Sequence, residues 1–193
     1  MKQHGLQAPH RMIRIRGPKV HDGTIIPIAP NVMWGTDATQ VMTRLEGTAT
    51  IFVAVDHYVG DIVGIHATLE PIYQGIREHF GPVASNIANG LLLRHDHGSQ
   101  YMSHHFQNEL NFLGITSSPS FIRAPEGNGV VERFIRTLKE QLLWVKHFDT
   151  VEELRRALHE FKDTFNRHWL LQRHEYATPA QVRWKYYVQQ EAA

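Results

Sequence analysis

The sequence predicts an α/β fold with a mixed five-stranded sheet and helices on both faces. Segments with strand character come first and then alternate with segments of helical periodicity. One apolar run, residues 48–55 (TATIFVAV), has the continuous character of a central strand covered on both faces. The 193 residues, 42% of them hydrophobic, suffice for one domain of ordinary size with a proper core.

Three candidate strands occupy the first half of the chain and are expected to pair antiparallel in sequence order. They are residues 32–42, 48–55 and 62–67, separated by the turn signals Glu46-Gly47 and Gly60-Asp61. Glycine beside an acidic residue is typical of the tight reversal between paired strands. Two hairpins in succession therefore form the antiparallel half of the sheet.

The second half alternates helical and strand patterns, which predicts crossover connections and parallel strands. The expected elements are a helix over 71–80, a strand at 91–93, a helix over 103–113, a strand at 115–117, a mobile loop over 119–129, helices from 129 and from 151, and a short last helix from Pro179. Ser103 and Asn128 are candidate helix caps, and Gly114 is a candidate helix stop. This order of elements fits the ribonuclease-H-like class.

Apolar residues at helical spacing define the buried faces of two late helices. The first stripe is Val131, Phe134, Ile135, Leu138, Leu142 and Val145, and the second is Val151, Leu154, Leu158, Phe161 and Phe165. Trp34 and Trp144 are expected in the core. The chain then divides into a lead-in (1–30), a core (31–148) and a helical closing segment of the same domain (149–193).

Composition excludes several classes of function. The chain has no cysteine, so disulfides, thiolate zinc sites and cysteine nucleophiles are absent, as suits a reducing cytoplasm. No stretch approaches the roughly 20 apolar residues that cross a bilayer, and no membrane partner is expected. Residues 1–30 hold five basic residues against one acid, although the whole chain has a net charge of +1. Such a basic lead-in is compatible with a polyanionic partner or with a solvated tail.

Three carboxylates stand out by their placement. Asp37 lies in a strand among apolar or uncharged neighbours, where an unpaired carboxylate is costly to desolvate. Asp96 follows an apolar strand, at the edge where open α/β sheets place ligands. Glu132 opens a helix directly after a loop. Oxygen ligands without cysteine or a histidine cluster favour Mg²⁺ or Mn²⁺, and two such ions suit phosphoryl transfer. Taken singly, each acid also fits a turn residue, a strand-end polar group or a helix-dipole partner.

Four ordered segments resemble a known family. Residues 34–39 (WGTDAT), 94–101 (RHDHGSQY) and 128–134 (NGVVERF) are similar to the three acidic motifs of insertion-sequence transposases with a retroviral-integrase-like core. Asp96 and Glu132 have 35 residues between them, the spacing typical of that class. A fourth segment, 166–180, resembles the stretch that closes these cores. Departures are His95, Phe165 and Glu175, where a small residue, tyrosine and glycine respectively are frequent.

The resemblance implies a DDE transposase, a polynucleotidyl transferase of the retroviral integrase superfamily. It implies metal-dependent cleavage at the ends of a mobile element and joining of the freed 3′ hydroxyl to another DNA. Asp37, Asp96 and Glu132 would be both the catalytic residues and the ligands of Mg²⁺ or Mn²⁺, with two ions expected. The expected partners are DNA, other copies of the chain on that DNA, and a separately encoded upstream DNA-binding protein. The expected location is the cytoplasm and the nucleoid. The chain alone is expected to lack end-specific recognition.

Several residues beside the acids are candidate DNA contacts. Glu132, Arg136 and Lys139 fall at positions i, i+4 and i+7, so a carboxylate and two cations share one helix face. Such cations can contact phosphates beside the metals, although the same pattern fits an ordinary solvated face. The other candidates are Arg133, His97, Gln100 and Asn128, of which His97 and Gln100 also suit bracing of Asp96.

Two other functions remain open on the sequence. A ribonuclease-H-like nuclease would use the same fold and hydrolyse only, but the long helices after Glu132 and the closing segment disfavour it. A catalytically silent or truncated DNA-binding transposase fragment would keep the acids as vestiges. Metal-linked stabilisation that is abolished by Asp96→Asn separates an active centre from a silent one.

Overall fold

The computed structural model describes residues 27–66, 70–119 and 128–192. Most of the predicted lead-in and of the predicted loop over 119–129 lie outside these residues. Five strands form one sheet in the order β3-β2-β1-β4-β5. Their bounds are β1 Met33–Thr43, β2 Gly47–Asp56, β3 Ile62–His66, β4 Leu92–His95 and β5 Thr116–Pro119. The first three strands pair antiparallel, whereas β1–β4 and β4–β5 pair parallel, which confirms the predicted mixed sheet.

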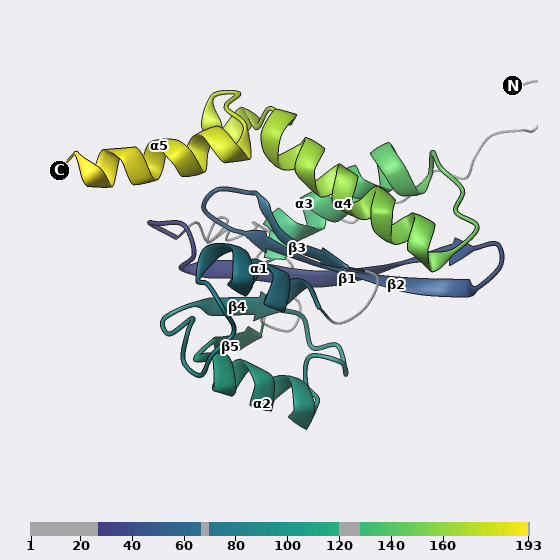
Figure 1. Cartoon of the computed structure of the whole chain (residues 1–193), viewed down its shortest axis with the longest axis horizontal. Helices are drawn as coiled ribbons and strands as arrows, with labels where there is room; N and C mark the ends of the chain where they lie inside the picture. Colours follow the sequence, from purple (N-terminus) through teal and green to yellow (C-terminus); the bar gives the residue numbers. More distant parts are fainter. Residues whose placement is uncertain (1–26, 67–69, 120–127, 193) are drawn as a thin grey trace, which may run out of the picture.

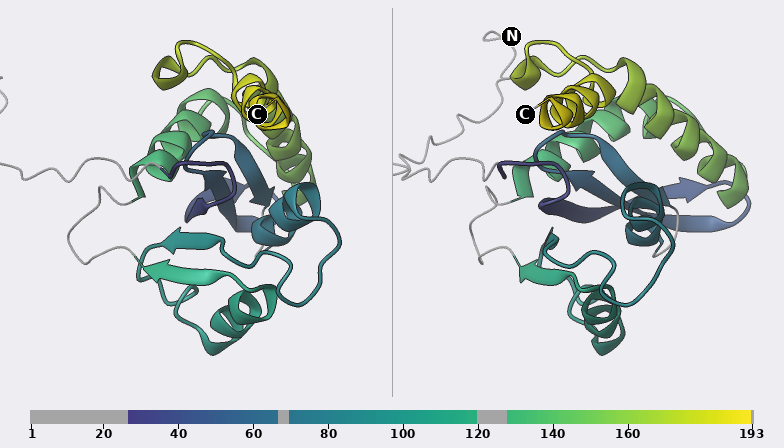
Figure 2. Two further views of the ribbon diagram at one scale, coloured as in Figure 1. Left: turned by 90° about the vertical axis from the view of Figure 1, so that its left-hand side faces the viewer. Right: turned by 60° about the vertical axis from the view of Figure 1, so that its left-hand side comes forward.

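Helices cover both faces of this sheet, as predicted. They are α1 Pro71–His79, α2 His104–Leu113, α3 Gly129–Leu138, α4 Val151–His168 and α5 Pro179–Glu191, with a π-helical turn η3 at Lys139–Leu143 and a 3₁₀ turn η4 at Gln172–His174. In Figure 1, α3 and α4 lie above the sheet and α2 lies below it. The two views in Figure 2 show the same separation.

The alternation of strand side chains gives each face its own core. On one face Ile51, Val53 and Val55 of β2 pack with α3 and α4. On the other face Ala54 of β2 joins Trp34 and the apolar side chains of α1 and α2. Because β2 is covered on both sides, its sequence is almost continuously apolar, as a central strand requires.

Helix ends follow the sequence signals closely. The Ser103 hydroxyl accepts a hydrogen bond from Phe106 N at 3.3 Å, and Gly114 ends α2 in the left-handed region with φ 78°. Both features confirm the predicted cap and stop. Thr178 and Gln181 form a capping box at the start of α5, so the segment beginning at Pro179 is a well-defined helix. At 13 residues α5 is longer than the short helix predicted.

The predicted core positions of Val145 and Trp144 are wrong, since these side chains are 68% and 69% exposed. The reason is that α3 ends at Leu138 and continues as the π-helical turn η3, in which Trp144 N donates to Lys139 O. A π turn contains an extra residue, so every later position rotates away from the 3.6-residue stripe. The earlier members of the stripe, Val131 to Leu142, are buried as predicted.

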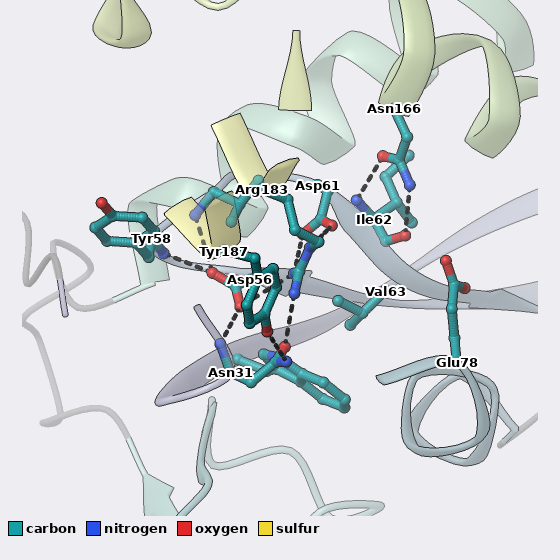
Figure 3. Close-up of polar contacts among 12 residues, drawn as sticks. Asn31, Asp56, Tyr58, Asp61, Ile62, Val63, Glu78, Asn166, Arg183 and Tyr187 are labelled. Atoms are coloured by element: carbon teal, nitrogen blue, oxygen red, sulfur yellow. Dashed lines mark hydrogen bonds and ion pairs between the residues drawn. The ribbon is translucent and has the colours of Figure 1, made fainter. Parts of the chain in front are cut away.

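A buried ion-pair network fastens α5 to the end of the sheet. Arg183 donates to both carboxylate oxygens of Asp61, at 2.8 and 3.0 Å, and to Asp56 Oδ2 at 3.4 Å. The Asp56 side chain also accepts from the backbone N–H groups of Asn31, Tyr58 and Val59. Figure 3 shows these groups converging beneath α5.

None of the five helices that the structure describes is long and apolar enough to cross a membrane.

Candidate metal centre

The parallel pairing of β1 with β4 brings the segments of Asp37 and Asp96 to the same end of the two strands. The pairing runs up to Gly35 and Arg94, and Asp37 and Asp96 each follow two residues later, the first within β1 and the second past the end of β4. The two carboxylates are near enough for the charge of Asp96 to raise the pKa of Asp37. Asp37 is half-buried within β1, and Asp96 is exposed just beyond the end of β4.

Short local hydrogen bonds orient both aspartates. Asp37 Oδ1 accepts from Ala38 N at 2.7 Å, and Asp96 Oδ1 accepts from Gly98 N at 2.8 Å. Each carboxylate keeps further lone pairs for other ligands, because a carboxylate offers about four acceptor sites. The predicted positions of the two acids in the fold are confirmed.

Glu132 approaches from the helix that covers the same region of β1. It lies in the first turn of α3, is exposed and shares its helix with the buried Val131 and Phe134. The buried stripe of α3 packs on β2 and so holds the helix against the sheet. Glu132 therefore comes from a third segment, as predicted.

The three carboxylates influence one another electrostatically. Burial raises the pKa of Asp37, the Ala38 hydrogen bond lowers it, and the negative charge of Asp96 raises it further. Burial also raises the pKa of Glu132, and the charge of Asp37 adds to that shift. A carboxylate that is partly buried beside another negative charge is stabilised by a bound proton or a nearby cation. Carboxyl groups with shifted pKa values are concentrated at functional sites.

The donor set fits a hard divalent cation, since all three side chains supply carboxylate oxygen. In the described ranges 27–66, 70–119 and 128–192, no group of three His, Cys, Asp or Glu side chains is gathered tightly enough to hold a metal ion.

A buried polar network lies next to the two aspartates, and no sequence pattern indicates the contacts that its members make. His95 contacts Asp96 O through Nδ1 at 2.6 Å and Ser117 Oγ through Nε2 at 2.8 Å. A carbonyl only accepts, so Nδ1 carries the proton and Nε2 accepts from the serine hydroxyl. Burial lowers the pKa of His95, which keeps the imidazole neutral as this arrangement requires. His95 thus ties β4 to β5 directly below Asp96.

Tyr101 extends this network to β1. Its ring stacks on His95 with centroids 5.3 Å apart, and its hydroxyl lies 3.5 Å from Thr36 Oγ1. Thr36 Oγ1 in turn donates to Val53 O of β2 at 2.8 Å. Through His95, Tyr101 and Thr36 this network links four neighbouring strands, β5, β4, β1 and β2.

The candidate DNA contacts separate into accessible and buried residues. Arg133 and Arg136 are exposed on α3, His97 is exposed, and Lys139 and Gln100 are partly buried. The positive charge of Lys139 lowers the pKa of Asp37, so the two side chains lie in the same region. Of the two cations predicted to share a helix face with Glu132, Lys139 therefore lies near Asp37, and Arg136 is exposed one turn before it.

Asn128 departs from its predicted role. It occupies the N-cap position of α3, but its side chain makes no capping hydrogen bond. The residue is only 4% exposed, and its Nδ2 donates to Thr36 O at 3.1 Å. An inward side chain of this kind does not present itself to DNA, and we remove Asn128 from the candidate contacts.

Comparison with known proteins agrees with this geometry. Residues 113–179 match the model of the integrase core domain. The transposase for insertion sequence element IS904 of Lactococcus lactis is 32% identical over 139 residues, which cover 71% of this chain and 54% of the relative. The putative transposase InsK for insertion sequence element IS150 of Escherichia coli is 24% identical over 156 residues, covering 80% and 55%. The chain spans about half the length of these relatives.

Solved structures are similar over most of the chain. The catalytic core domain of BIV integrase superposes with a TM-score of 0.56 at 23% identity, covering 84% of this chain and 97% of that one. A chain of the simian T-cell lymphotropic virus intasome gives a TM-score of 0.64 at 22% identity, covering 82% and 56%. The fold is thus the ribonuclease-H-like fold of integrase catalytic cores. The chain is similar to the integrase core domain over residues 113–179 and to insertion-sequence transposases over most of its length, as the acidic motifs indicated.

Proposed function

We propose that this chain is the catalytic core of a DNA transposase, which cuts at the ends of an insertion element and joins the freed 3′ hydroxyl to another DNA. The observation that supports this proposal is that Asp37 and Asp96 follow the paired ends of β1 and β4, while the charge of Asp37 raises the pKa of Glu132 on α3. The integrase core match and the insertion-sequence relatives support the same reaction class.

In this proposal Asp37, Asp96 and Glu132 hold Mg²⁺ or Mn²⁺. One related structure, the HTLV-2 integrase catalytic core domain, was solved in complex with magnesium. When bound, two such ions activate an attacking hydroxyl and stabilise the leaving oxygen of an in-line displacement. Burial and the neighbouring negative charges raise the pKa values of Asp37 and Glu132, which is consistent with a bound cation at these carboxylates.

The remaining residues bind and orient. Arg133, Arg136 and Lys139 present cations beside the acids, where they would contact DNA phosphates. His97 and Gln100 follow Asp96 in the chain and would contact the DNA strand that is bound at Asp96. His95 contacts the backbone carbonyl of Asp96 and Tyr101 contacts the side chain of Thr36, and these contacts would help to orient the two aspartates for substrate.

DNA is the proposed partner, and a multimer on DNA follows from the need to join two ends at one target. Related integrase cores have been solved in dimeric and trimeric forms and within an intasome. We also propose that a separately encoded DNA-binding protein takes part in end recognition, in the cytoplasm and at the nucleoid.

A cleavage and joining assay tests the proposal. The chain is incubated with Mn²⁺ and concentrated oligonucleotides from the DNA that flanks its gene, so that weak end recognition is sufficient. We expect joined products that disappear in Asp96→Asn and Glu132→Gln and persist in Glu140→Gln, an exposed acid on the following turn. Hydrolysis without joining would instead identify a nuclease, and no reaction by the wild-type chain would identify a silent fragment.

A further inference from the structure

One buried side chain connects α3 with the strand that bears Asp37. Asn128 Nδ2 donates to Thr36 O at 3.1 Å, and this carbonyl belongs to the peptide bond between Thr36 and Asp37. Asn128 lies immediately before α3, one helical turn ahead of Glu132. A single hydrogen bond therefore joins the backbone beside one acid to the start of the helix that carries another.

The β1 end of this contact is itself fixed. Thr36 Oγ1 donates to Val53 O at 2.8 Å and approaches the Tyr101 hydroxyl, so the residue is held from the opposite face of the sheet. Thr36 is 1% exposed and Asn128 is 4% exposed. A hydrogen bond between two buried and otherwise constrained groups is costly to lose, because the carbonyl would remain without its donor.

Gly35 makes room for the contact. A Cβ atom at this position would lie 2.7 Å from Asn128 Oδ1 and 2.4 Å from His57 Nε2, closer than real Cβ contacts come. Because strand side chains alternate, Gly35 and Asp37 face the same side of β1. The small residue thus lets Asn128 lie flat against the strand, two residues from the proposed metal ligand.

We propose that Asn128 is a positioning residue, whose amide ties the start of α3 to the Thr36–Asp37 peptide and so sets Glu132 in register with Asp37. This inference rests on the proposed metal function for its consequence, but the tie itself exists without metal. The position of a ligand in the first turn of a helix depends on how firmly that turn is held, and the regular helix of α3 ends ten residues later at the π turn η3.

Asn166 provides a matched control. Its side chain also binds a strand backbone, donating to Ile62 O at 2.9 Å and accepting from Ile62 N at 2.8 Å (Figure 3). It lies on α4 and binds β3, away from the three acids. Loss of either asparagine removes an amide-to-strand link, but only loss of Asn128 should affect Glu132.

The test compares the wild-type chain with Asn128→Ala, Asn128→Leu and Asn166→Ala. Leucine keeps the branching of asparagine at Cγ and fills the site without being able to donate the hydrogen bond, so it covers the case in which alanine fails to fold. Hydrogen exchange is measured without metal at residues 130–134, and Mn²⁺ affinity is measured by metal-linked thermal stabilisation. We expect faster exchange at 130–134 and about 10-fold weaker Mn²⁺ binding in the Asn128 variants. Asn166→Ala should show neither change.

Unchanged exchange at 130–134 in a folded Asn128 variant, or Mn²⁺ affinity within about 2-fold of wild type, would overturn the inference. A wild-type chain that binds no Mn²⁺ would refute the metal function instead, and the exchange result would then decide alone whether Asn128 holds the start of α3. Equal loss of Mn²⁺ affinity in Asn166→Ala would also count against a positioning role, because general destabilisation would explain both variants.

Discussion

Replacing Arg183 by methionine should destabilise the fold strongly and in a pH-dependent way. Arg183 makes a two-pronged ion pair with Asp61 and a longer contact with Asp56, and the side-chain exposures of the three residues are 13%, 7% and 0%. Breaking a buried pair on one side costs about 3–5 kcal/mol, because a charge stays buried without its partner. Asp56 keeps its three backbone donors, so the lower end of that range, about 3 kcal/mol at pH 7, is expected.

The pH dependence follows from the direction of the Asp56 shift. Burial first, and then Asp61, raise the pKa of Asp56 in the folded state, while Arg183 lowers it. A carboxyl group with a raised folded pKa destabilises the fold when ionised, and this cost disappears as the pH falls through that pKa. Removing Arg183 raises the pKa further. The stability lost in Arg183→Met should therefore shrink between pH 7 and pH 5.

Urea unfolding followed by circular dichroism at both pH values measures this effect. Lys185→Met is the matched control, since Lys185 is an exposed cation on the same helix and its loss should change the free energy of unfolding by about 0.5 kcal/mol or less. A loss below about 1 kcal/mol at pH 7 in Arg183→Met, or an equal loss at pH 5, would refute the reasoning.

Four further predictions address the site and its supports. Gly35→Ala should weaken Mn²⁺ binding about 10-fold, as the Asn128 variants do, because the new methyl group would collide with Asn128 Oδ1; normal binding would contradict the proposed close approach. Asp37→Asn should raise the Tm in EDTA, since it removes a buried carboxylate repelled by Asp96, and should abolish any further rise with Mn²⁺. Thr178→Ala should cost about 1 kcal/mol in urea unfolding through loss of the α5 capping box, and a cost near zero would show that packing alone holds this end. Glu175→Gly should stabilise the chain by up to about 1 kcal/mol, because Glu175 has a φ of 55°, where glycine is unstrained; destabilisation would show that its side chain makes a compensating contact.

Local patterns predicted most of the fold. The apolar run of β2, the turn glycines and the cap at Ser103 each act within a few residues, and the structure confirms the elements that they define. The π turn at Lys139–Leu143 could not be predicted, because it changes the helical period without changing the hydrophobic character of the residues. Trp144 and Val145 were therefore assigned to the wrong side of the helix.

The positions of the proposed metal ligands could be predicted from the sequence, but most of the contacts that hold the surrounding structure could not. Asp96 and Glu132 stand at a strand end and a helix start, and these placements are visible in the sequence. The contacts of Asn128 with Thr36 and of Arg183 with Asp61 join residues 92 and 122 positions apart, so only the folded chain brings them together. His95 and Tyr101 lie within a recognised motif, but their contact with each other depends on the turn after β4.

Calorimetric titration with Mn²⁺ of the wild-type chain and four acid variants tests the central claim most directly. If Asp37, Asp96 and Glu132 form one metal centre, Asp37→Asn, Asp96→Asn and Glu132→Gln should each weaken binding at least about 10-fold, while Glu140→Gln leaves it unchanged. Wild-type affinity retained in any one of the three, or lost equally in Glu140→Gln, would contradict the assignment of these carboxylates to a common site.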